Sequence, residues 1–125
     1  MNTVRIIQWI TGIAGLLALA LGLLYWFAAA NGIPVHMILG LVVTLGLLSL
    51  GVIALLTRGM RPLGAAAVVY ALFVPAFGMT QATILPGELH WLIRLAHLLV
   101  GIGALALMGA ISARYRQRAA GAATA

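Results

Sequence analysis

The sequence contains no cysteine and no lysine, and Glu88 is its single acidic residue. Without cysteine, the chain forms no disulfide, no thiolate metal site, no iron–sulfur cluster and no covalent c-type haem attachment. Any metal or redox cofactor must therefore be held by histidine, methionine or backbone groups. The basic side chains are seven arginines, which leave a formal net charge of +6.

Charged residues of both signs are scarce. They make up 6% of the chain, whereas apolar residues make up 65% and the mean hydropathy is +1.20. This composition excludes an ordinary soluble domain and is typical of an integral membrane protein. The arginines lie at the ends of apolar segments and not along one face, so we expect no nucleic-acid binding. We also find no nucleophile–base constellation and no phosphate loop, and we expect no enzymatic activity from this chain alone.

Four apolar segments are long enough to cross a lipid bilayer, over residues 6–30, 35–56, 63–82 and 89–111. Turn residues separate them, and Pro75 is expected to kink the third segment. The sequence therefore predicts an all-α fold, an integral membrane four-helix bundle. We expect one transmembrane domain over residues 1–118 and a disordered Ala/Gly-rich tail over residues 119–125.

The distribution of arginine predicts the topology. If every segment spans, all the arginines except Arg94 fall on one side, and the positive-inside rule makes that side cytoplasmic. Both termini are then cytoplasmic, and we expect the bacterial inner membrane as the location. The three histidines, Arg94 and Glu88 gather toward the outer side.

The histidines follow an internal pattern. The second segment contains VHMILG, in which Gly40 comes one turn after His36, and the fourth contains AHLLVG, in which Gly101 comes one turn after His97. The chain thus resembles two helical hairpins related by a pseudo-repeat, and repeat-related side chains at similar depth meet across a bundle axis. A glycine one turn below a ligand leaves room for a flat macrocycle.

Ionisable residues inside a membrane segment indicate a functional site. We therefore predict that haem b lies between the second and fourth helices, with His36 and His97 as iron ligands and Gly40 and Gly101 beside the macrocycle. His90 and Arg94 share a helix face with His97.

Arg94 is expected to pair with haem propionates. His90 remains an alternative ligand to His97. His36 lies 22 residues before Arg58, whereas His97 lies only 17 residues before Arg114, so the depths of His36 and His97 do not match fully. The competing interpretation is that the histidines bond to backbone or headgroups and that Arg94 extends to the membrane surface.

The second half of the chain contains the short motifs Arg61-Pro62-Leu63, Phe77-Gly78-Met79-Thr80, Pro86-Gly87 and His97-Leu98-Leu99. These motifs resemble the third and fourth helices of one half of haem A synthase. Each half of that family is a four-helix bundle with haem-facing histidines on its second and fourth helices, and His36 falls where the second-helix ligand would be. The first outer loop lacks the family's cysteines and acidic residue, so the resemblance implies a b-type haem site and not haem A synthesis. A more distant resemblance is to cytochrome b561-like bundles.

The expected function is that of a small membrane b-type cytochrome, which transfers electrons to or from a redox protein or a quinone. The alternative is a non-catalytic accessory subunit, which packs against a larger membrane complex or another copy through Gly/Ala-rich faces. A proton-coupled transporter is disfavoured because the spanning segments carry no carboxylate.

Overall fold

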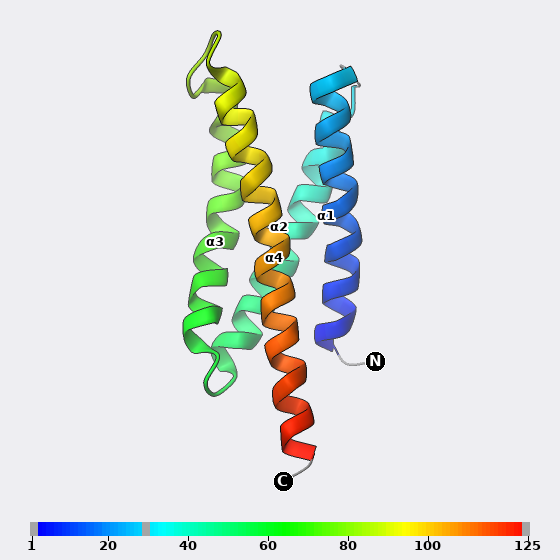
Figure 1. Cartoon of the computed structure of the whole chain (residues 1–125), viewed down its shortest axis with the longest axis vertical. Coiled ribbons are helices and arrows are strands. Elements are labelled where there is room, and N and C mark those ends of the chain that lie inside the picture. The colour runs from blue at the N-terminus through cyan, green and yellow to red at the C-terminus, as the bar shows by residue number, and fades with distance from the viewer. Residues whose placement is uncertain (1–2, 29–30, 124–125) are drawn as a thin grey trace.

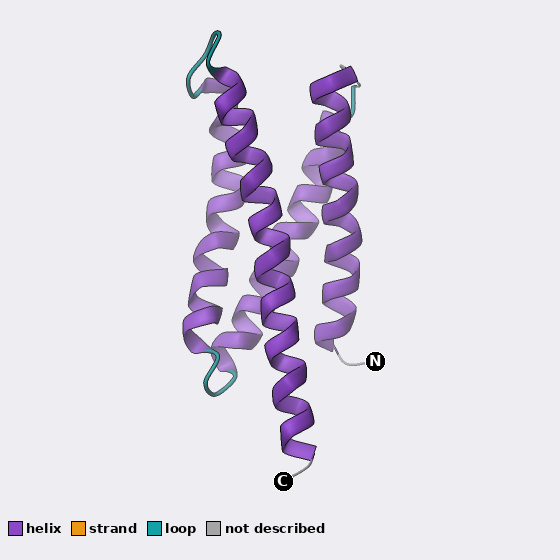
Figure 2. Ribbon diagram, viewed as in Figure 1, coloured by secondary structure: helices purple, strands orange, loops and turns teal. Residues whose placement is uncertain are grey.

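The computed structural model of the protein describes residues 3–28 and 31–123. These residues form four α-helices, α1 (Thr3–Ala28), α2 (Ile33–Leu56), α3 (Arg61–Thr80) and α4 (His90–Ala123), with a short 3-10 turn at Gln81–Thr83 (Figures 1 and 2). No strand occurs in the described part of the chain. The prediction of an all-α four-helix bundle is confirmed.

All four helices are long and apolar enough to cross a membrane, as expected of a multi-pass membrane protein. Pro34 and Pro62 lie in the first turns of α2 and α3, where proline costs no helical hydrogen bond. The end of the bundle that holds both termini and the α2–α3 loop is called the basic end below, because it carries every arginine except Arg94. The opposite end, with the α1–α2 turn and the α3–α4 connection, is called the histidine end (Figure 1).

The last helix is longer than the sequence predicts. Its apolar part ends near Ile111, but α4 continues as one helix of 34 residues to Ala123. Residues 119–123 are therefore helical, where a disordered tail is expected, because four of the five are alanine, which favours helix, and no proline interrupts them. Residues 124–125, and residues 29–30 at the expected end of the first segment, lie outside the described residues. α3 also continues through Pro75.

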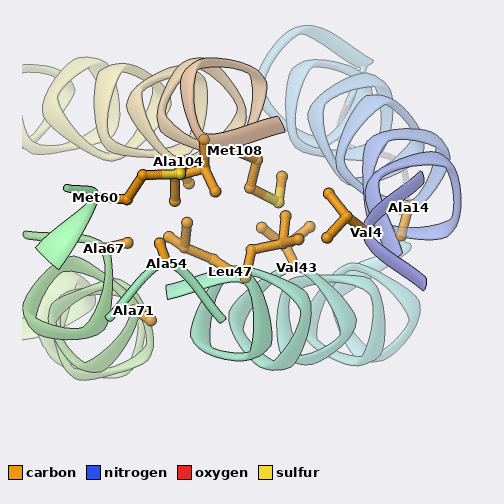
Figure 3. Packing of buried hydrophobic residues seen from close by; sticks show 12 residues of the cluster. Val4, Ala14, Val43, Leu47, Ala54, Met60, Ala67, Ala71, Ala104 and Met108 are labelled. Atoms are coloured by element: carbon orange, nitrogen blue, oxygen red, sulfur yellow. The ribbon is translucent and has the colours of Figure 1, made fainter. Parts of the chain in front are cut away.

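The hydrophobic core lies in the half of the bundle toward the basic end. Leu47, Leu50 and Ala54 of α2 are completely buried, and they pack with small or flexible residues of the other helices (Figure 3). Met60, just before α3, is also completely buried and fills the space beneath α4. These contacts fix how the helices cross.

Glycine allows α2 and α3 to approach backbone to backbone within this core. A Cβ atom on Gly64 would meet the Leu55 amide nitrogen and would lie 2.8 Å from the Gly51 carbonyl oxygen. Both partners are backbone atoms, so no side-chain movement could relieve the contact. This contact is the closest kind of helix packing, which small residues permit in membranes.

The half toward the histidine end is packed differently. No residue is fully buried in the parts of the four helices nearest this end, residues 19–28, 33–42, 72–80 and 90–103. The part of each helix toward the basic end does contain buried residues. In Figure 1, α1 and α4 diverge toward this end. The shared core of the four helices thus lies toward the basic end, and no fully buried side chain surrounds the histidines.

Candidate functional site

His36 and His97 lie beside each other between α2 and α4. Their ring centroids are 5.9 Å apart, and the ring planes are inclined by 49°. Both side chains are partly exposed. The two histidines come from different hairpins, and 60 residues intervene between them in the sequence, so only the packing of the bundle brings them together.

His36 and His97 lie side by side although their sequence separations from Arg58 and Arg114 differ. Because α4 extends beyond the other helices at the basic end (Figure 1), Arg114 does not mark the same depth as Arg58. The long last helix therefore absorbs the difference.

The ring of His36 is oriented by the neighbouring helix. Its Nδ1 lies 2.8 Å from the backbone carbonyl oxygen of Ala18 in α1. A carbonyl acceptor fixes the proton on this nitrogen and leaves the other ring nitrogen as a neutral ligand, the usual arrangement of metal-binding histidines.

The ring of His97 has no such acceptor. Its Nδ1 is buried and has no hydrogen-bond partner among the described residues. The ring lies against Phe77 of α3, with centroids 6.1 Å apart at 35°. A buried polar nitrogen without a partner costs about 1–3 kcal/mol. Only a group that bonds to Nδ1 itself would offset that cost.

Glycines on the odd-numbered helices leave room for both rings. A Cβ atom on Gly22 would lie 3.4 Å from His36 Cε1, and one on Gly78 would lie 3.5 Å from His97 Cε1. Each histidine therefore stacks over a glycine of the helix that precedes it in the same hairpin. The sequence pattern does not place Gly22, Gly78, Phe77 or the Ala18 carbonyl at the site.

The glycines one turn after the histidines border open space. A Cβ atom on Gly40 or on Gly101 would meet nothing within 4 Å. Both glycines are partly exposed. No neighbouring side chain therefore occupies the position next to either glycine.

His90 and Arg94 lie closer to the histidine end than His97. His90 Nδ1 lies 3.3 Å from the carbonyl oxygen of Ile84 in the α3–α4 connection. Arg94 is exposed on α4, one turn from both histidines of that helix. The structure thus brings His97, and not His90, next to His36.

The paired imidazoles fit the ligand spacing that a haem requires. A metal–imidazole bond of about 2 Å on each side, with about 1 Å more to each ring centre, puts the two centroids roughly 6 Å apart. The observed 5.9 Å is compatible with this separation and is also an ordinary separation for two rings in direct contact. The described residues contain no group of three or more His, Cys, Asp or Glu side chains that could hold a metal ion. A haem needs only two protein ligands, because the macrocycle supplies the other four.

Comparisons of the chain with protein-family models, with curated proteins and with solved structures find no match.

Proposed function

We propose that this protein is a small b-type cytochrome of the bacterial inner membrane, with both termini in the cytoplasm. His36 and His97 bind the haem iron from α2 and α4, near the outer face. The observation that supports this most strongly is the 5.9 Å separation of two imidazoles from different hairpins. The open space beside Gly40 and Gly101 supports it further.

The residues of the site suit electron transfer. A bound haem supplies an iron that changes oxidation state by one electron. His36 and His97 would together hold the iron through two imidazoles, which would leave no ligand position for oxygen and would favour electron exchange. The Ala18 carbonyl and the aromatic face of Phe77 hold the two rings in place. The site lies at the histidine end, so a redox protein on the outer side or a quinone in the membrane is the expected partner.

Arg94 is assigned to the haem propionates, and this role can be tested by the reduction potential. Arg94→Gln removes a positive charge that favours the reduced haem, so the midpoint potential should fall on the order of 40 mV. Redox titration followed by visible absorbance measures this. Arg61→Gln, at the basic end, is the matched control and should leave the potential unchanged. An equal shift in both variants would contradict the assignment.

The glycines beside the histidines can be filled without removing a ligand. Gly101→Leu places a side chain in open space, so the helix should form, but the leucine would occupy the space that we assign to the macrocycle. Haem content should fall about tenfold while the amount of folded protein is maintained. Ala106→Leu places the same side chain at an exposed position of α4 and should keep full haem content. Full haem content in Gly101→Leu would place the cofactor elsewhere.

The haem stoichiometry tests the proposal itself. Protein purified in detergent from haem-replete cells should contain one b-type haem per chain, as measured by the pyridine haemochromogen assay. A haem-free accessory subunit would instead purify together with partner chains and would keep that association in a His36→Ala, His97→Ala double variant. That outcome would replace the cytochrome proposal.

A further inference from the structure

A groove runs between α1 and α4 at the basic end, on the other half of the bundle from the histidines. It encloses about 590 Å³. None of the residues that line it belongs to the haem site, so a ligand bound in this groove is independent of the proposed function.

The mouth of the groove is polar and basic. Arg5 from the first turns of α1 and Arg116 from the last turns of α4 line it together with Gln8. Arg116 Nη1 donates a hydrogen bond to Gln8 Oε1 over 2.8 Å, which holds the guanidinium across the gap between the two helices. The exposed indole of Trp9 lies beside this mouth. Tryptophan next to arginine is typical of the headgroup region of a membrane.

The deeper part of the groove is apolar. Its walls include Ile13, Leu16 and Leu105, and two glycines, Gly12 and Gly109, line it from opposite helices. A Cβ atom on either glycine would meet nothing within 4 Å, so these positions leave the groove open where other residues would narrow it.

The length of the groove matches one leaflet of a bilayer. Arg5 and Leu16 both line it, and a helical rise of about 1.5 Å per residue puts them roughly 16 Å apart. Half of a hydrocarbon core of about 30 Å is about 15 Å. An extended acyl chain whose headgroup lies at Arg5 therefore ends near Leu16.

We propose that this groove binds one anionic phospholipid. The phosphate lies between Arg5 and Arg116, and one acyl chain runs over Gly12 and Gly109 between α1 and α4. The preference for an anionic lipid follows from charge, because two guanidinium groups line the mouth and no acidic residue does. The lipid would fill the groove between α1 and α4, which the side chains of the protein leave open.

Native mass spectrometry of the detergent-purified protein tests the proposal, with phosphatidylglycerol and phosphatidylcholine of equal chain length added in competition. We expect a retained phosphatidylglycerol adduct and a lower affinity for phosphatidylcholine. Arg5→Gln and Arg116→Gln should each weaken phosphatidylglycerol binding roughly fivefold, since an arginine near anionic lipid contributes about that much. Arg61→Gln lies at the same end outside the groove and is the matched control. Equal binding of the two lipids, or equal losses in all three variants, would overturn the proposal.

A second set of variants tests the path of the acyl chain. Gly12→Leu and Gly109→Leu fill the groove and should weaken binding of both lipids, whereas Ala20→Leu on the exposed face of α1 should not. If the groove is occupied by a second copy of the chain instead, the glycine variants will reduce the dimer fraction and leave lipid binding intact. That result would also overturn the proposal.

Discussion

Replacing either His36 or His97 by alanine should abolish the six-coordinate haem spectrum and lower haem content at least tenfold. Each substitution would remove one of the two imidazoles that would hold the iron. Loss of a group that only orients a metal ligand already costs about 10–100-fold in metal affinity, so loss of a ligand should cost at least tenfold. The helices should persist, because neither side chain belongs to the buried core. Haem content per chain and the reduced spectrum measure the effect, and circular dichroism verifies the fold.

His90→Ala is the matched control for these variants. His90 faces the Ile84 carbonyl and not His36, so its removal should leave the iron ligands in place. Added imidazole should restore the six-coordinate spectrum of His97→Ala, because a free imidazole can enter the space left by the side chain. If His90→Ala loses the haem and His97→Ala retains it, His90 is the ligand and the assignment of His97 is wrong.

The second large effect is expected far from the histidines, at the contact between α2 and α3. Gly64→Val would drive a side chain into the backbone of α2, where the Gly51 carbonyl oxygen would lie 2.8 Å from its Cβ and the Ala54 carbonyl carbon 2.9 Å. Neither atom can move without separating the helices, so the protein should lose about 3 kcal/mol of stability. Thermal unfolding in detergent, followed by circular dichroism, measures the loss.

Gly109→Ala provides the comparison for this substitution. Its Cβ would meet nothing within 4 Å, and alanine favours helix over glycine, so stability should stay the same or rise slightly. Equal unfolding temperatures for Gly64→Val and Gly109→Ala would show that α2 and α3 do not approach as closely as described.

Much of the fold could be predicted because hydropathy and helix punctuation are strong signals in a membrane sequence. The apolar runs and the turns at Pro34 and Pro62 place α2 and α3 to within about two residues, within the usual uncertainty of helix ends. The end of α4 could not be predicted in this way. Hydropathy predicts only the part of a helix that crosses the membrane, so it cannot show that α4 continues beyond the apolar run. Only the helix propensity of the individual residues bears on residues 112–123.

The candidate site could be predicted in part. The repeat of histidine and glycine indicates that His36 and His97 meet, and the structure brings their rings together. The contacts that orient the rings could not be predicted. The Ala18 carbonyl leaves no trace in a side-chain pattern, and Gly22 and Gly78 cannot be told from ordinary packing glycines until the neighbouring helices are placed.

The visible spectrum of the purified protein, first oxidised and then reduced with dithionite, distinguishes a two-histidine haem protein from a haem-free one. We predict a sharp α-band on reduction together with a shift of the Soret band, the signature of a six-coordinate haem held by two histidines. A colourless protein from haem-replete cells, or a broad spectrum of a five-coordinate haem, would contradict the assignment of His36 and His97 as paired ligands.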